Sequence, residues 1–276
     1  MTATVISTRS VAPTRTIEPR PRGAGDPWRQ SWSLAKRALI NTKRVPESLI
    51  DVTLQPVIFT LLFSYIFGGA ISGTVGSYLT ILVPGILAQS IAFASMGIGM
   101  SLRTDMESGV FDRFRSLPIA RVAPLLGQAL ASVVRYVLLI GVVLSTGAVL
   151  GYRVGGGFGH FLLGALLLIV FASALSWGPM IVGLLARSAG AIQGTLMMML
   201  FPLTFASNAF VPTDSMPGWL RAFADHNPVS YLVEAVRALW SGAGEWHHAT
   251  VMTLGWCVAM TVVLMPLAIR AYNRKA

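Results

Sequence analysis

The side chains that most often do chemistry in proteins are few and widely separated in this chain of 276 residues. A single cysteine, Cys257, excludes a disulfide framework and every multi-thiolate metal site. The histidines lack the i, i+4 spacing with a carboxylate that makes a helical metal site, and the consecutive pair points to different faces: His160, His226, His247 and His248. The sequence therefore predicts no metal ligands.

Acidic groups offer equally little to an enzyme or to an ion-coupled transporter. No carboxylate lies within any span predicted below, and those on the predicted outer side are scattered among caps and turns: Asp214, Asp225, Glu234 and Glu245. Arg135 is the one charge within a span, where proton coupling would favour Asp or Glu, and its long side chain can reach cytoplasmic headgroups. We predict no catalytic residue. An ion-coupled secondary transporter and a membrane-embedded lipid-modifying enzyme remain the alternative classes.

The lysines do not form a phosphate-binding loop for ATP. Such a loop needs a glycine before its lysine and a serine or threonine after it. None of the three lysines, Lys36, Lys43 and Lys275, has both neighbours. The chain is therefore not expected to bind ATP by that motif.

Long uncharged stretches place the chain among integral membrane proteins. Hydrophobic residues make up 54% of the sequence and charged residues 12%, whereas roughly a quarter of a soluble domain is charged. A helix needs about 20 apolar residues to cross a bilayer core of ~30 Å. The sequence predicts an all-α fold with six transmembrane helices and a glycine-rich turn at 68–77; the spans are about 52–69, 78–101, 122–151, 158–186, 189–211 and 250–270.

Basic residues set the orientation of these helices. With the N-terminus inside, all 21 Lys and Arg residues fall on the inner side except Arg135 within a span and Arg153, Arg221 and Arg237 outside. Because basic residues gather on the cytoplasmic side, both termini are predicted to be cytoplasmic, in a multi-pass protein of the cell membrane. The net charge of +10 then reflects topology and attraction to anionic membrane lipids, and no nucleic-acid partner is expected.

Two segments precede the first span. Residues 1–25 are rich in Pro, Gly, Ser and Thr, cannot bury a core, and are predicted to form a disordered cytoplasmic tail. From 28 to 42, apolar residues recur at helical spacing, with Trp28 and Trp32 on one stripe and basic residues on other faces. This pattern predicts an N-terminal amphipathic helix in the interface, and a merely charged leader to the first span is the alternative.

The loop between the second and third spans contains a predicted amphipathic helix at 107–118. Four apolar side chains lie on one side of this helix, charged side chains surround them, and a proline ends it. Such a helix can press its apolar residues into a groove on a partner. A helix that only floats on the headgroups is disfavoured by its acidic residues. The predicted partner-binding residues are Glu107, Val110, Phe111, Asp112, Phe114, Arg115, Leu117 and Pro118.

The external segment 212–249 is predicted to form a hairpin of two short helices that re-enters the outer leaflet. Asn227 is the expected cap of the second helix, Pro228 occupies its first position and Gly242 ends it. An apolar face at helical spacing demands burial, and it is expected to pack against the outer ends of the fifth and sixth spans; its members are Val229, Leu232, Val233, Val236, Leu239 and Trp240.

Segments that stand in a fixed order among the six spans resemble a known family. They are Pro46–Phe59, Phe67–Ile71, Glu107–Pro118 and Asn208–Pro212 through Asn227–Tyr231. Together they resemble the permease subunits of type-2 ABC exporters, and among them the daunorubicin/doxorubicin-resistance permeases of actinobacteria. The resemblance runs from about residue 28 to the C-terminus and implies a type-2 ABC transmembrane domain over 26–276. The loop helix at 107–118 is then the coupling helix.

The resemblance also implies the partners of the chain. Two copies of a separate ABC ATPase subunit would use ATP and Mg, and this chain itself would bind no cofactor. A second permease copy would complete the transporter, as a homodimer or as a heterodimer with a paralogue. The implied activity is export of a hydrophobic or amphipathic substrate, and a drug, a lipid and a glycolipid all fit.

Residues for the substrate path and an external gate follow from combining the spans with this resemblance. Small residues in the second span suit a close-packed dimer interface, with ordinary helix packing as the alternative; they are Gly85, Ala88, Ser90, Ala92, Ala94, Ser95, Gly97 and Gly99. The predicted path residues are Phe59, Phe63, Phe93, Phe201, Phe205 and Asn208. The predicted gate residues are Asn227, Pro228, Tyr231, Glu234 and Arg237, with the last two spaced for an ion pair. Headgroup depth is expected for Trp219, Trp240 and Trp246.

Overall fold

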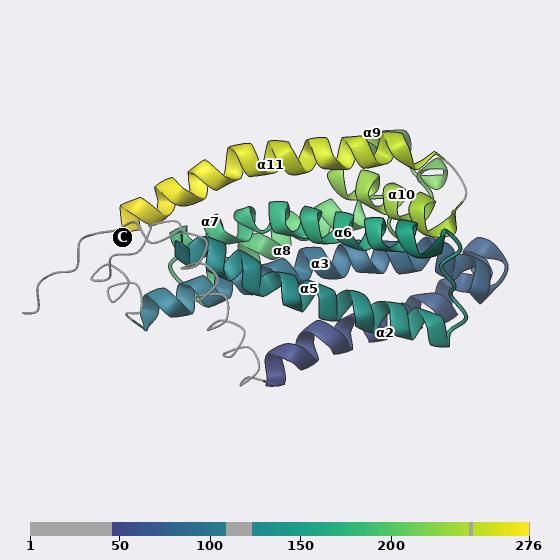
Figure 1. The fold of residues 1–276 in the computed structure, drawn as a ribbon, viewed down its shortest axis with the longest axis horizontal. Coiled ribbons are helices and arrows are strands. Elements are labelled where there is room, and N and C mark those ends of the chain that lie inside the picture. Colours follow the sequence, from purple (N-terminus) through teal and green to yellow (C-terminus); the bar gives the residue numbers. More distant parts are fainter. Residues whose placement is uncertain (1–45, 109–122, 243–244, 276) are drawn as a thin grey trace, which may run out of the picture.

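The computed structural model describes residues 46–108, 123–242 and 245–275, and these form an elongated bundle of helices (Figure 1). The C-terminus lies at one end of the bundle, and the short helices α9 and α10 lie at the other (Figure 1). We call these the C-terminal end and the α10 end. The helices are α2 (Pro46–Ser72), α3 (Val75–Glu107), α5 (Ala123–Val149), α6 (Gly157–Leu175), α7 (Trp177–Leu185), α8 (Ala189–Phe205), α9 (Gly218–Asp225), α10 (Pro228–Ser241) and α11 (Trp246–Lys275), with a 3₁₀ turn at Thr213–Ser215.

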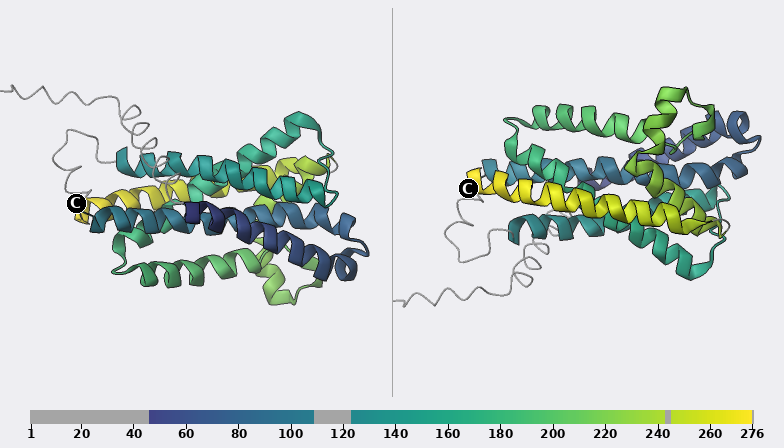
Figure 2. Two further views of the ribbon diagram at one scale, coloured as in Figure 1. Left: turned by 90° about the horizontal axis from the view of Figure 1, so that it is seen from below. Right: turned by 90° about the horizontal axis from the view of Figure 1, so that it is seen from above.

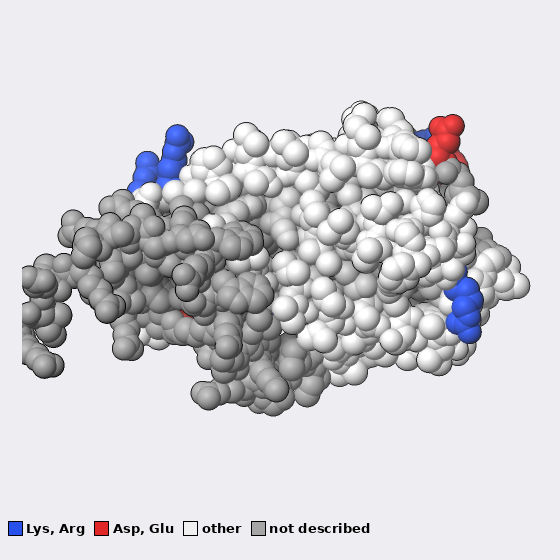
Figure 3. Space-filling view, in the orientation of Figure 1, with Lys and Arg blue, Asp and Glu red and all other residues white. Residues whose placement is uncertain are grey.

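Four of the described helical segments are long and apolar enough to cross a membrane. Their mean hydropathy lies between 1.8 and 2.2, and they are Val75–Glu107, Leu125–Val149, Gly157–Leu185 and Trp246–Arg274. Two shorter apolar helices, Thr53–Gly69 and Ala189–Phe205, accompany them. On the face seen in Figure 3, the charged side chains gather at the two ends and the middle carries none. These features confirm an all-α membrane protein.

The turn between the first two helices is much shorter than predicted. Helix α2 continues to Ser72 and α3 begins at Val75, so Gly68 remains helical. Gly73 has a φ of 73°, and Thr74 caps α3 by accepting a hydrogen bond from the Ser77 amide at 3.2 Å. Glycines are common inside membrane helices, which is why the Gly-rich run at 68–77 was a misleading turn signal.

The helix predicted at 158–186 is interrupted near its middle. Helix α6 ends at Leu175 and α7 begins at Trp177. Pro179 lacks the amide hydrogen that would bond the Leu175 carbonyl, which accounts for the break. The Met180 amide still donates to the Ser176 carbonyl at 3.1 Å, so α7 follows α6 directly across the break.

Helix α3 lies at the centre of the bundle and packs against α2, α5, α6, α7, α8 and α10. Its small residues permit these contacts within the chain: Gly85 meets the backbone of Ala209, and Gly99 meets the backbone of Pro179 and Gly183. Ala88, with no exposed surface, is likewise buried in the core. Packing within the chain therefore accounts for Gly85, Ala88 and Gly99, and a dimer interface at the other small residues stays a prediction.

Several predicted features lie outside the described residues. The N-terminal tail at 1–25, the interfacial helix at 28–42 and most of the coupling helix at 107–118 belong to this group. They stay predictions from the sequence.

Candidate functional site

The helix predicted to follow Asn227 is present as α10, and its ends have the predicted chemistry. The Asn227 Oδ1 accepts a hydrogen bond from the Val229 amide at 2.9 Å, and Pro228 occupies the first turn. Gly242 follows the helix with a φ of 69°, in the left-handed region that ends helices. Local sequence signals therefore located both ends of α10 correctly.

The apolar face of α10 is buried, as predicted. None of its six members is more than 1% exposed: Val229, Leu232, Val233, Val236, Leu239 and Trp240. They pack against α11, which is the predicted sixth span, and against α6 and α3. The predicted contact with the sixth span is thus confirmed. In place of the predicted fifth span, the face packs against α6 and α3. Re-entry of the hairpin into a bilayer stays a prediction.

The three tryptophans near this end do not share one environment. Trp219 is 76% exposed, whereas Trp240 has no exposed surface and its Nε1 donates to the Phe161 carbonyl at 3.2 Å. Gly164 of α6 lies beneath the Trp240 ring, where any side chain would collide. Trp240 is therefore buried inside the bundle, because the glycine creates a place for the indole, and headgroup depth stays a prediction for all three tryptophans.

Asn227 also joins α10 to the end of α8. Its Nδ2 donates to the Leu203 carbonyl at 2.7 Å and to the Ala206 carbonyl at 3.1 Å. The helix end at α8 leaves these carbonyls without helical partners, and the amide side chain supplies them. The Asn227 side chain thus caps the start of α10 and the end of α8.

Arg237 does not form the predicted ion pair with Glu234. No contact within 4 Å joins the two charges in the described part of the chain. Instead, the Arg237 guanidinium donates to the carbonyls of Ile81 (2.8 Å), Asn208 (2.8 Å) and Ala209 (3.0 Å). The planar, five-donor guanidinium suits several carbonyls at once, and Glu234 is left exposed.

Three consecutive backbone carbonyls after α8 accept hydrogen bonds from side chains of two helices, α3 and α10. Arg237 binds those of Asn208 and Ala209, and the Tyr78 hydroxyl of α3 donates to that of Phe210 at 3.1 Å. The Asn208 amide donates to the Ser230 hydroxyl at 3.2 Å. We call Tyr78, Asn227 and Arg237 the α10 clamp. It ties the irregular chain after α8 to α3 and α10.

The structure brings four of the predicted path residues into one row of stacked rings. Phe59 and Phe63 of α2 lie 5.7 Å apart, and Phe201 and Phe205 of α8 lie 4.2 Å apart. Phe210 joins the two pairs, at 5.0 Å from Phe63 and 5.2 Å from Phe205. The row thus links α2 to α8.

The other two predicted path residues, Phe93 and Asn208, lie outside this row of rings, whereas Phe210 belongs to it without having been predicted. Phe93 takes no part in the stacked row and packs against the core. Asn208 enters the α10 clamp through its backbone, and its side-chain Oδ1 is buried without a hydrogen-bond partner among the described residues. Phe210 was not predicted as a path residue: the predicted fifth span ran to 211, whereas α8 ends at Phe205 and Phe210 lies in the irregular chain after it.

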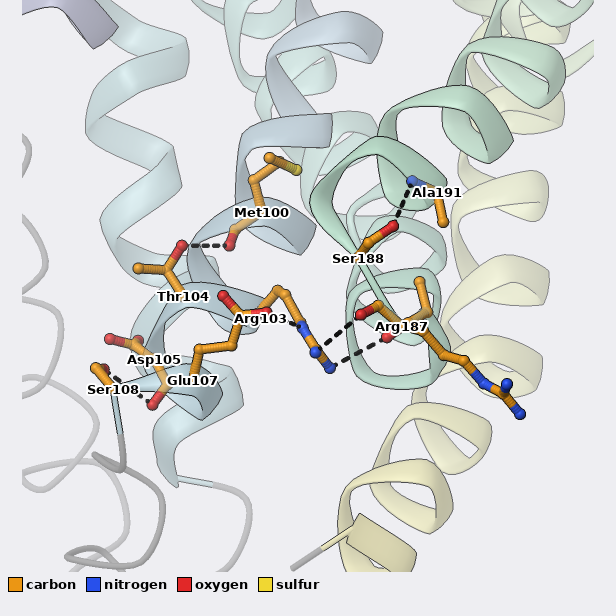
Figure 4. Close-up of polar contacts among 10 residues, drawn as sticks. Met100, Arg103, Thr104, Asp105, Glu107, Ser108, Arg187, Ser188 and Ala191 are labelled. Atoms are coloured by element: carbon orange, nitrogen blue, oxygen red, sulfur yellow. Dashed lines mark hydrogen bonds and ion pairs between the residues drawn. The ribbon is translucent and has the colours of Figure 1, made fainter.

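At the C-terminal end, Arg103 links the end of α3 to the start of α8 (Figure 4). Its guanidinium donates to the carbonyls of Ala186 (3.2 Å) and Arg187 (3.0 Å) and pairs with Glu107 at 2.8 Å. Ser188 then caps α8 by accepting from the Ala191 amide at 3.2 Å. The i, i+4 spacing of the ion pair was visible in the sequence, but its backbone partners were not.

Of the predicted coupling residues, only Glu107 lies among the described residues. It belongs to the last turn of α3 and not to a separate helix, because α3 continues beyond its predicted end at 101. The other seven fall in the undescribed segment 109–122: Val110, Phe111, Asp112, Phe114, Arg115, Leu117 and Pro118. Arg103 and Glu107 therefore stand where the described chain enters that loop.

An apolar groove of about 510 Å³ lies between α5, α6, α7 and α11. Leu126, Ser173, Trp177 and Cys257 are among its lining residues, and none of the predicted path residues lines it. No group of three or more His, Cys, Asp or Glu side chains in the described ranges could hold a metal ion.

A bundle of apolar helices tied together at both ends by arginine-to-carbonyl contacts defines a multi-pass membrane protein. The ABC-2 type transporter family model matches residues 29–240, and the chain belongs to this family.

Individual relatives agree with this assignment. A daunorubicin resistance ABC transporter permease protein of Streptomyces coeruleorubidus is 40% identical over 240 residues, which cover 87% of this chain and 84% of that protein. A doxorubicin resistance ABC transporter permease of Mycobacterium tuberculosis is 30% identical over 252 residues, 86% of each chain. A putative transport permease of Cyanophora paradoxa is 28% identical over 212 residues, 75% of this chain and 73% of that protein.

Proposed function

We propose that this chain is the membrane-spanning permease subunit of an ATP-driven exporter of hydrophobic or amphipathic compounds. The observation that carries the proposal is the 40% identity, over 87% of the chain, to a daunorubicin resistance permease. A separate ATPase subunit, in two copies, supplies the energy from ATP and Mg, because the lysines of this chain lack a phosphate-binding loop. Drugs, lipids and glycolipids remain the candidate substrates.

In this proposal the four long helices and the two shorter ones, α2 and α8, form six spans of the cell membrane. The C-terminal end faces the cytoplasm, because Arg103, Arg187 and Arg270 lie there. The α10 end then faces outward. The α9–α10 hairpin is the external re-entrant element, and its burial between α3, α6 and α11 supports this role.

Coupling to the ATPase enters through the loop at 107–118. When ATP closes the two ATPase subunits, this loop moves with them and pulls on the end of α3. The Arg103 contacts to the Ala186 and Arg187 carbonyls carry that movement to the start of α8. Helices α3 and α8 therefore move together at the cytoplasmic end.

A second permease copy completes the path along α8. Both views in Figure 2 show α8 at the margin of the bundle. Only Ile192, Leu196, Leu200 and Thr204 of this helix are buried, whereas Met198 is 81% exposed. The partner copy covers this exposed face, and the row of phenylalanines from α2 to α8 lies beside the resulting path.

Vesicle transport tests the proposal directly. Inverted membrane vesicles that contain this chain and its ATPase subunit are expected to accumulate daunorubicin, or a fluorescent phospholipid, only when ATP is present. An ATPase variant without its phosphate-binding lysine is the matched control and is expected to abolish accumulation. If neither compound moves in an ATP-dependent manner while the two subunits co-purify, the assignment as an exporter is wrong.

A further inference from the structure

Arg135 occupies the interior of α5 without a compensating charge. It is the only charged residue between Leu125 and Val149, one of the four apolar segments long enough to span a membrane. Ten residues separate it from Leu125, or about 15 Å along a helix, which is near the middle of a ~30 Å hydrocarbon core. A charge at this depth is costly and marks a functional site by default.

The guanidinium lies against α3 and does not extend to the cytoplasmic end. Gly97 makes this placement possible, because a Cβ built there would lie 2.5 Å from the Arg135 Nη1. Gly97 precedes Arg103 by six residues, so the guanidinium lies about 9 Å deeper than Arg103 along α3. The side chain therefore lies against α3, and contact with the headgroups stays a prediction.

No acceptor within the described chain binds this guanidinium. Its hydrogen bonds and ion pairs would fall within 4 Å, and none joins it to any described residue, whereas Arg103 and Arg237 each have at least three partners.

From this geometry we infer that Arg135, held against Gly97, is the binding group for the anionic headgroup of an amphipathic molecule. Arginine only donates hydrogen bonds, so a phosphate, carboxylate or sulfate oxygen is the complementary ligand. The apolar tail of that molecule would lie among the hydrocarbon-facing side chains of the spans. A bound anion offsets the cost of placing a charge within a span.

This inference rests on the proposed function only when the bound molecule is the exported substrate, and it then narrows the substrate class. Daunorubicin carries an amino group that is protonated at neutral pH, and a lone guanidinium repels it. An anionic amphiphile is thus the preferred cargo over a cationic drug. The site itself exists whether or not the chain transports anything.

A fluorescent fatty acid tests the site on the full chain without the ATPase. The probe is 11-(dansylamino)undecanoic acid, and its methyl ester is a neutral control of the same shape. The protein is placed in phosphatidylcholine nanodiscs, and binding is followed by the rise in dansyl fluorescence. The acid is expected to bind about tenfold or more tightly than the ester, the difference that one charged hydrogen-bonded pair provides.

Matched variants attribute this difference to the site. Arg135→Gln is expected to lower acid affinity to that of the ester, whereas Arg135→Lys keeps the charge and retains part of the preference. Gly97→Ala is expected to weaken acid binding by displacing the flexible end of Arg135. Gly141→Ala on α5, where the added Cβ meets only open space, is its control. Arg153→Gln removes an exposed arginine and controls for net charge.

The lipid composition identifies the source of the anion. If phosphatidylglycerol in the nanodiscs displaces the acid from wild-type protein but not from Arg135→Gln, the site holds a membrane lipid headgroup. If the acid keeps its affinity against phosphatidylglycerol, the site selects soluble amphiphiles. Equal binding of acid and ester by wild type, or an unchanged preference in a folded, monodisperse Arg135→Gln protein, overturns the inference. Failure of vesicle transport with an intact acid preference would refute only the exporter.

Discussion

At the scale of single residues, the α10 end depends on side chains that bind backbone carbonyls. Asn227 and Arg237 together satisfy five carbonyls, on α3, on α8 and on the chain after α8. Helix ends leave such carbonyls without partners, and a buried carbonyl that loses its partner costs about 1–3 kcal/mol. These two residues are therefore expected to be more sensitive to substitution than their polarity suggests.

Replacing Asn227 with alanine removes a helix cap and two buried hydrogen bonds at once. We expect a loss of about 2–4 kcal/mol in the free energy of unfolding, together with reduced export. Thermal unfolding in detergent measures the first effect and vesicle transport the second. Asn273→Ala changes an exposed asparagine near the end of α11 and is the control. Equal melting of both variants and wild type would contradict the cap.

Arg237→Lys keeps the charge but replaces a planar five-donor group with a point charge. A lysine cannot match three separated carbonyls, so we expect a loss of about 2–4 kcal/mol in the free energy of unfolding and weaker transport. Glu234→Gln is expected to change stability by less than about 0.5 kcal/mol, because Glu234 is not the partner of Arg237. A larger loss of unfolding free energy in Glu234→Gln than in Arg237→Lys would show that the Glu234–Arg237 ion pair is the important contact.

At the scale of helices, α3 is the element that reaches both ends of the molecule. Tyr78 near its start binds the Phe210 carbonyl, and Arg103 near its end binds the chain before α8. Glycines along its length bring it into backbone contact with its neighbours, which makes sliding of one helix past another costly. A movement that begins in the loop at 107–118 is thus passed on by a rigid helix.

Arg103→Gln separates ATPase binding from transport. The loop residues would still bind the ATPase, but the link to α8 would be lost, so we expect normal co-purification and about tenfold slower transport. Arg187→Gln is the matched control, because Arg103 binds only the backbone carbonyl of that residue. Equal transport by the two variants would show that α3 and α8 are coupled elsewhere.

Charges placed on the predicted loop helix are expected to prevent ATPase binding, unlike Arg103→Gln, which should leave that binding intact. Phe111→Asp or Phe114→Asp should leave membrane insertion intact while abolishing co-purification with the ATPase, because each places a charge on the predicted apolar contact face. Pull-down from solubilised membranes measures this loss. Retained ATPase binding in both variants would remove the loop helix from the coupling mechanism.

At the scale of the whole molecule, the bundle has two polar ends and an apolar middle, which fixes its position in a bilayer. The C-terminus marks one end, and α9 with α10 marks the other (Figure 1). The exposed apolar face of α8 lies along the middle, where either lipid or a second copy can cover it. The distribution of basic residues decides which end is cytoplasmic.

Cysteine labelling tests this orientation. In a Cys257→Ser background, cysteines at Thr74 and Ser215, both exposed near the α10 end, are expected to react with an impermeant thiol reagent added to intact cells. A cysteine at Asn273, exposed near the C-terminal end, should react only after the membrane is opened. Labelling of Asn273→Cys in sealed cells would invert the topology.

The sequence by itself determined the class, the helical content and the ends of α10. Uncharged stretches require membrane helices because backbone groups must be satisfied within lipid, and Asn227, Pro228 and Gly242 act on the backbone within a few residues of their own position. The apolar face of α10 followed from helical periodicity alone. Such signals depend only on residues close together in the sequence, so they can be recognised without the tertiary structure.

Only the tertiary structure decided which polar groups meet across the bundle. Arg237 had a carboxylate at ion-pair spacing in the sequence, yet it binds carbonyls of α3 and of the chain after α8. Trp240 is buried because Gly164 of another helix makes room for it, and Arg135 lies against Gly97 for the same reason. These outcomes depend on which helices approach closely, and helix spacing along the chain does not contain that information.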